Sequence, residues 1–196
     1  MNYRHVILEG KPTTGKTEVS ELLKIYFPGQ VIVLPELTTV LVRAHGLNIL
    51  RDRAPLSAML EEAVPARSAE VERLLAEHPA SMVLEESHMG VHWAYSAVID
   101  DRTFLDLYDE KIAPHVRIPD LFLRLDIPIE LSVRRQKARA TKDVEVDGAL
   151  VSRMFENLNR WHNARGHGRL HLLNTDRSPE IVLTELLDLL GLRYGA

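Results

Sequence analysis

The sequence contains no cysteine and no excess of positive charge, and each absence excludes a class of protein. Without cysteine among its 196 residues, the chain forms no disulfide, no thiolate metal site and no cysteine nucleophile. The formal net charge is -4, so no basic surface predicts nucleic acid or an anionic membrane as a partner. A small anionic ligand stays open, because backbone amides and a few cations can bind an anion whatever the global charge.

Long hydrophobic runs are also missing. No apolar stretch approaches the roughly 20 residues that span a bilayer, and the chain starts without the long apolar core of a signal peptide. Hydrophobic residues make up 45% of the chain and charged residues 27%, the balance of an ordinary globular domain. No linker, internal repeat or low-complexity segment divides the chain. We therefore expect one cytoplasmic domain over residues 1–196.

Short runs rich in Val, Ile and Leu alternate with longer helix-like segments. The hydrophobicity of these runs is continuous, which is typical of parallel strands covered on both faces. They begin at His5, Val31, Ser81, Asp120 and Arg169. Between them, a 3.6-residue period predicts helices over residues 16–27, 57–78, 129–140, 150–163 and 178–191. The alternation predicts an α/β fold with a doubly wound parallel sheet.

The loop after the first run carries a phosphate-binding motif. Residues 10–17 read Gly-Lys-Pro-Thr-Thr-Gly-Lys-Thr, which matches G-x-x-x-x-G-K-[ST] between a predicted strand and a predicted helix. Glycines let backbone amides turn toward phosphate oxygens, and the new helix presents its positive end to them. The lysine supplies a cation to the β- and γ-phosphates, and the last threonine is a candidate Mg²⁺ ligand. The predicted nucleoside triphosphate site comprises Gly10, Pro12, Thr13, Thr14, Gly15, Lys16, Thr17 and Glu18.

Further features distinguish among proteins with such a loop. A GTPase would need a D-x-x-G after a strand and a guanine-reading N-K-x-D, but the D-x-x-G at 188–191 ends a predicted helix and residues 174–176 lack the lysine. A small-molecule kinase needs a cationic lid that closes over the phosphates. The segment at about 134–148 fits a lid, because Arg135 and Arg139 lie one helical turn apart with Lys137 between them. A solvated basic face is the alternative interpretation.

Motifs in the order of a known family run along nearly the whole chain: GKPTTGKT, VLPE, LEESHMGVHWAYSA, RRQKARA and LLNTD. They resemble the P-loop nucleoside and nucleotide kinases, nearest the deoxynucleoside kinase and thymidylate kinase branch. The resemblance implies a three-layer fold with sheet order 2-3-1-4-5, ATP or GTP as donor, and Mg²⁺. It makes Glu36 a base or substrate contact and places residues 85–87 beside the phosphates. It also implies that Asp176 borders the purine base and that the phosphates are gripped by Arg135, Lys137 and Arg139.

One position departs from the family pattern. After the third strand the family usually has an acid followed by an arginine, whereas this chain has Glu85 followed by Glu86. Arginine fixes an acceptor that carries a phosphate, while a hydroxyl acceptor needs a carboxylate to orient or deprotonate it. The extra acid favours the hydroxyl of a nucleoside or nucleoside-like molecule, antibiotics included, as acceptor. A thymidylate-kinase-like monophosphate kinase and a nucleotide sensor without turnover stay open as alternatives.

Each acid near the phosphate loop has a structural role as its alternative. Glu36 is the candidate base, or it caps the next helix through Thr38 and Thr39. Glu85 is the candidate Mg²⁺ ligand, directly or through water, or it pairs with the lid. Glu86 contacts a polar or cationic group of the acceptor, or it is a solvated side chain.

The remaining acceptor candidates lie on predicted helices. Arg43 and Arg67 belong to the segment at about 37–78, from which such kinases cover the acceptor, and both are candidate phosphate contacts. His92 and Tyr95 follow the third strand and are candidate acceptor contacts, with aromatic packing as the alternative. The expected partners are the acceptor and a nucleoside triphosphate, without nucleic acid or membrane, and a homodimer is left open.

Overall fold

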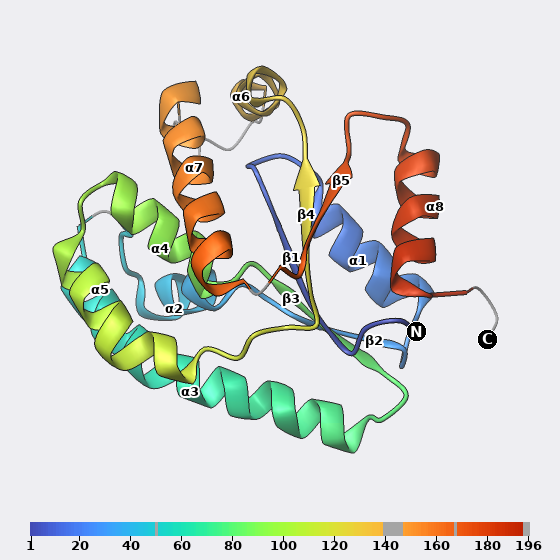
Figure 1. The fold of residues 1–196 in the computed structure, drawn as a ribbon, viewed down its shortest axis with the longest axis horizontal. Coiled ribbons are helices and arrows are strands. Elements are labelled where there is room, and N and C mark those ends of the chain that lie inside the picture. Colours follow the sequence, from blue (N-terminus) through green and yellow to red (C-terminus); the bar gives the residue numbers. More distant parts are fainter. Residues whose placement is uncertain (50, 139–146, 167, 194–196) are drawn as a thin grey trace.

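A five-stranded parallel sheet forms the centre of the structure, a computed structural model that describes residues 1–49, 51–138, 147–166 and 168–193 (Figure 1). The strands run in the order β2-β3-β1-β4-β5, which confirms the predicted topology. Each predicted apolar run contains one strand: β1 His5–Gly10, β2 Val31–Leu34, β3 Met82–Glu86, β4 Leu121–Asp126 and β5 Leu170–Asn174. Because all the strands are parallel, their carboxyl ends meet at one edge of the sheet.

Helices cover both faces of this sheet (Figure 1). One face carries α1 (Lys16–Tyr26) and α8 (Pro179–Leu190), where Leu23, Leu186 and Phe27, which directly follows α1, are buried against the strands. The other face carries α2 (Leu37–His45), α3 (Arg53–Glu77), α4 (Met89–Val98), α5 (Arg102–Leu107), the π-helical turn Tyr108–Ile112, the 3₁₀ turn Ala113–His115 and α7 (Gly148–Arg165). The fold thus has three layers, as predicted.

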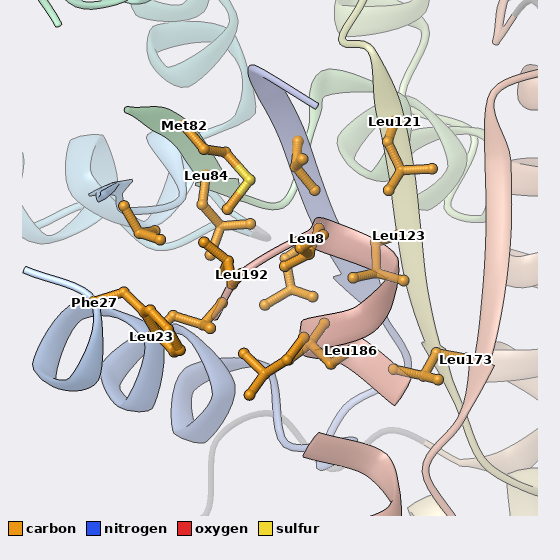
Figure 2. Packing of buried hydrophobic residues seen from close by; sticks show 14 of the residues in the cluster. Leu8, Leu23, Phe27, Met82, Leu84, Leu121, Leu123, Leu173, Leu186 and Leu192 are labelled. Atoms are coloured by element: carbon orange, nitrogen blue, oxygen red, sulfur yellow. The ribbon is translucent and has the colours of Figure 1, made fainter. Parts of the chain in front are cut away.

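Alternation along β1 and β3 decides which side chains reach each layer. Leu8 belongs to the core on the α1 and α8 side, and Figure 2 shows it between Leu84 of β3 and Leu123 of β4. Its neighbour Ile7 belongs to the core on the opposite side. Each such side chain, removed from water, contributes roughly 1.5–3 kcal/mol. The register pairs Ile7 with Glu85 and Leu8 with Glu86, so these two carboxylates project from opposite faces.

The segment predicted as a lid is described only in part. Helix α6 (Ile129–Lys137) forms its start, and α7 begins at Gly148. Residues 139–146, which include the predicted phosphate contact Arg139, lie outside the described residues. Among the helices that the structure describes, none combines the length and apolar character needed to cross a membrane.

Candidate functional site

The loop between β1 and α1 has the backbone that its glycines make possible. Gly10 has φ 156° and Gly15 has φ 95°, and a Cβ on Gly10 would lie 2.5 Å from the carbonyl oxygen of Leu125. Only glycine fits so closely against β4. Lys16 starts α1 and folds back over the loop, where its Nζ donates to Gly10 O at 3.1 Å and Lys11 O at 3.2 Å. The lysine ammonium is therefore already in the concave side of the loop.

Helix α6 is hydrogen-bonded directly to this loop. Ser132 Oγ donates to Pro12 O at 2.7 Å, and Thr13 Oγ1 donates to Ser132 O at 3.1 Å. Arg135 follows on the same helix, and its Nη1 donates to Thr13 O at 3.4 Å. Lys137 instead lines a separate groove between α6 and α7. The structure thus brings Arg135 to the loop and places Lys137 away from it.

The loop after β5 lies against the phosphate loop from another direction. The hydroxyl of Thr175 donates to Thr14 O at 3.3 Å. Asp176, which follows, is exposed, and its backbone amide donates to Asn174 Oδ1 at 2.8 Å. Asp176, which is predicted to border the purine base, therefore directly follows a residue that contacts the phosphate loop.

A cluster of buried charges lies beneath the loop. Glu9, which directly precedes Gly10, accepts from Arg124 Nε at 2.8 Å and lies 2.8 Å from His162 Nε2. Burial by itself would raise the pKa of Glu9, but the hydrogen bond and charge of His162 and the charge of Arg124 lower it below its ordinary value. Arg124 also donates to Asn159 Oδ1 at 2.6 Å. The sequence interpretation missed this cluster, although charged residues inside apolar runs are a signal for it.

The two acids of β3 have different surroundings. Glu85 is buried, with Oε1 2.7 Å from His5 Nε2, while its Oε2 accepts from Arg67 Nη1 at 3.2 Å. Glu86 faces α1, where Ser20 Oγ donates to its Oε1. The same hydroxyl donates to Thr17 O at 3.1 Å, so Glu86 lies one helical turn from the candidate metal ligand. Within the described residues, no group of three or more His, Asp or Glu is arranged to hold a metal ion.

Glu36 lies where three cavities meet. It follows β2 and precedes α2, and its Oε2 accepts from Thr39 Oγ1 at 2.7 Å. One cavity of about 250 Å³ is lined by Glu36 together with Gly10 and Lys16 of the phosphate loop. A second, of about 390 Å³, extends from Glu36 over α2 and α4. The third lies between Glu36 and Glu85. The carboxylate thus has access both to the loop and to the space beneath α2.

The cavity of about 390 Å³ brings together four predicted acceptor residues, Glu36, Arg43, His92 and Tyr95. Its other lining side chains are polar and apolar: Thr38, Thr39, Val42, Ile49, Val91 and Met154. Burial lowers the pKa of His92 to about 4, so its imidazole is neutral at neutral pH. Its ring lies edge-on to Phe104 at 4.4 Å between centroids. Burial raises the pKa of Tyr95, although the charge of Arg53 opposes the shift. Both side chains therefore present neutral hydrogen-bonding groups.

Arg67 lies outside that cavity. Its Nη1 donates to Pro35 O at 3.0 Å as well as to Glu85, and its Nε lies 3.2 Å from Glu70 Oε2. It lines the third cavity, next to Glu36. The two arginines predicted to contact an acceptor phosphate, Arg43 and Arg67, are therefore not brought together.

Comparisons with known proteins agree with this architecture. No family model matches the chain. A thymidylate kinase of Synechococcus sp. (strain CC9311) is 28% identical over 182 residues, which cover 83% of this chain and 84% of the relative. A thymidylate kinase of Synechococcus sp. (strain WH7803) is also 28% identical, over 186 residues that cover 85% and 86%.

Solved structures share the fold at lower identity. Deoxyadenosine kinase from M. mycoides, with dCMP and dCDP bound, matches with a TM-score of 0.70 and 10% identity over 95% of this chain and 98% of the neighbour. Thymidylate kinase from Ehrlichia chaffeensis matches with a TM-score of 0.60 and 18% identity over 98% and 100%. Sequence and fold are thus both similar to those of the P-loop nucleoside and nucleotide kinases, nearest the deoxynucleoside kinase and thymidylate kinase branch.

Proposed function

We propose that this protein is a Mg²⁺-dependent phosphotransferase that moves the γ-phosphoryl group of ATP or GTP to a hydroxyl of a nucleoside or nucleoside-like molecule. The observation that carries the proposal is the cavity of about 250 Å³ that Glu36 shares with Gly10 and Lys16, because it connects a phosphate-binding loop with a carboxylate. The whole chain acts as one domain. Its lid spans about 134–148, and helices from about 37–78 cover the acceptor.

The donor binds at the phosphate loop. The amides at the start of α1 bind the phosphate oxygens, and Lys16 Nζ exchanges its carbonyl partners for them. Arg135 approaches from α6 and stabilises the charge of the transferring group, a role shared with Arg139 of the lid. Asp176 borders the base. Lys137, which lines the groove between α6 and α7, stays a predicted donor contact.

The residues beside Thr17 fit a magnesium ion. Thr17 belongs to the first turn of α1, and the Glu86 carboxylate accepts from Ser20 of the same helix; oxygen is the ligand type that Mg²⁺ prefers. Bound there, the ion would neutralise charge on the β- and γ-phosphate oxygens. We therefore assign to Glu86 the metal role that was predicted for Glu85, whose carboxylate projects to the opposite side.

Glu36 acts as the base. The Thr39 hydroxyl donates to its carboxylate, and Glu36 lines both the cavity that it shares with Lys16 and the cavity of about 390 Å³, which supports this role. A carboxylate in this position accepts the proton of an attacking hydroxyl as the phosphoryl group is transferred. An acceptor phosphate would not need this base.

The acceptor binds in the cavity of about 390 Å³. Its volume accommodates a sugar and a base, and Arg43, neutral His92 and Tyr95 supply hydrogen bonds to polar atoms of the ring. Apolar neighbours such as Val42 and Met154 contact the ring faces. These properties support a nucleoside or a compound of similar shape.

The test is triphosphate turnover in the presence of single nucleosides, monophosphates and hydroxyl-bearing antibiotics. We expect a hydroxyl compound to raise turnover strongly, and we expect Glu36→Gln to abolish most of this rise while the donor still binds. Glu72→Gln, an exposed carboxylate of α3, is the matched control and should behave as the parent protein. Full transferase activity of Glu36→Gln would refute the base assignment.

A second candidate function is monophosphate phosphorylation. The 28% identity to two thymidylate kinases favours it. In that case a nucleoside monophosphate would raise triphosphate turnover, whereas unphosphorylated nucleosides and antibiotics would not. The same screen separates the two candidates.

A further inference from the structure

One arginine joins three elements of the acceptor side. Arg67 Nη1, from α3, donates to Pro35 O at 3.0 Å and to Glu85 Oε2 at 3.2 Å. Pro35 directly precedes Glu36, and Glu85 belongs to the neighbouring strand β3. The side chains of Arg67 and Glu85 are only 13% and 12% exposed, so solvent screens this contact weakly.

Glu85 is itself fixed in the sheet. Its Oε1 lies 2.7 Å from Nε2 of His5, a residue of β1 that is fully buried. The backbone amide of His5 donates to Asp120 Oδ2 at 2.9 Å, which secures the start of β1. Burial would raise the pKa of Glu85, but the hydrogen bond and charge of His5 and the charge of Arg67 lower it below its ordinary value, so Glu85 is ionised at neutral pH. Arg67 therefore has a charged acceptor at neutral pH.

These contacts leave little of the arginine's charge for a ligand. Two carboxylates, Glu85 and Glu70, lie within 3.2 Å of the Arg67 guanidinium. An arginine that binds an acceptor phosphate would instead be expected to point its guanidinium into the acceptor cavity of about 390 Å³. The pairing of Arg67 with two carboxylates therefore differs from its predicted role as a contact of the acceptor phosphate.

We infer that Arg67 and Glu85 are positioning residues, which fix the Pro35 carbonyl and thereby hold the catalytic carboxylate of Glu36 at the attacking hydroxyl. The inference rests on the proposed function. It assigns to Glu85 a role other than metal binding, and to Arg67 a role other than phosphate binding.

Arg67→Met should lower kcat about 10- to 100-fold, because a displacement of the base by about 1 Å is enough for such a loss. The KM for the triphosphate should change less than about twofold, since the phosphate loop is untouched. Arg67→Lys keeps the charge without the planar guanidinium, so its kcat should lie between those of the parent protein and Arg67→Met. Arg73→Met is the matched control on α3, because Arg73 pairs with the exposed Glu77 one turn along the same helix, and it should have parental kcat.

A double-mutant cycle with Glu36→Gln separates positioning from other roles. If Arg67 acts through Glu36, then Arg67→Met causes no further loss of kcat in the Glu36→Gln protein. An equal fold-loss in both backgrounds would overturn the inference, as would a rise in acceptor KM with unchanged kcat. Glu85→Gln, which preserves shape, provides the same cycle if Arg67→Met does not fold. Full activity of Glu36→Gln alone would show that the proposed base has failed, independently of this inference.

Discussion

Removing the Arg124 guanidinium perturbs the buried charges beneath the phosphate loop. The side chains of Arg124 and Glu9 are 5% and 1% exposed, and their N–O distance is 2.8 Å. Loss of one partner of a buried ion pair costs about 3–5 kcal/mol, because the other charge stays buried. His162 remains at 2.8 Å from Glu9, so Arg124→Met should cost about 3 kcal/mol, the lower end. For a chain of this size, that lowers the thermal midpoint by roughly 6–12 °C.

The assay is thermal unfolding followed by circular dichroism at neutral pH. Adding Glu9→Gln to Arg124→Met removes the unpaired carboxylate and should restore at least half of the lost midpoint. Arg160→Met is the control, because Arg160 is exposed on α7 and donates to Asn157 of the same helix. If Arg124→Met lowers the thermal midpoint by less than about 2 °C, or if the double variant is no more stable than Arg124→Met alone, the reasoning is refuted.

Three further changes have defined outcomes. Gly10→Ala would place Cβ 2.5 Å from Leu125 O, so triphosphate affinity measured by calorimetry should fall more than about tenfold; unchanged affinity would contradict the loop geometry. The pKa of Glu9 lies below its ordinary 4.5, so its stabilisation is present above that pH and is lost as the pH falls through the lower folded value. The midpoint advantage of the parent over Glu9→Gln should therefore shrink in acid; a constant advantage would oppose this. Gly90→Ala would place Cβ 2.7 Å from the Trp161 ring and should cost about 1–3 kcal/mol in denaturant unfolding, whereas no cost would argue against this contact.

Much of the fold was predictable because local patterns and global topology agree. Continuous apolar runs identified every strand of the sheet, and the loop motif fixed which strand precedes the phosphate site. Helix boundaries were less accurate. Helix α3 begins at Arg53, before the predicted start at residue 57, because its first turn has little periodic hydrophobicity.

The site was only partly predictable, because side-chain direction in a strand depends on register. Sequence alone placed Glu85 and Glu86 together after β3, but alternation sends them to opposite faces of the sheet. The partners of Glu85 come from β1 and α3, and such long-range contacts have no local signal. The tie between Arg67 and Pro35 was unpredictable for the same reason.

Direct detection of the phosphorylated product tests the central claim. The protein would be incubated with Mg²⁺, ATP or GTP labelled on the γ-phosphate, and a mixture of nucleosides and nucleoside monophosphates, and the labelled products would be identified by mass spectrometry. We predict label on a former hydroxyl oxygen of a nucleoside or a nucleoside-like compound, and its loss in Glu36→Gln. Label found only in nucleoside diphosphates, or transferred equally well by Glu36→Gln, would contradict the account.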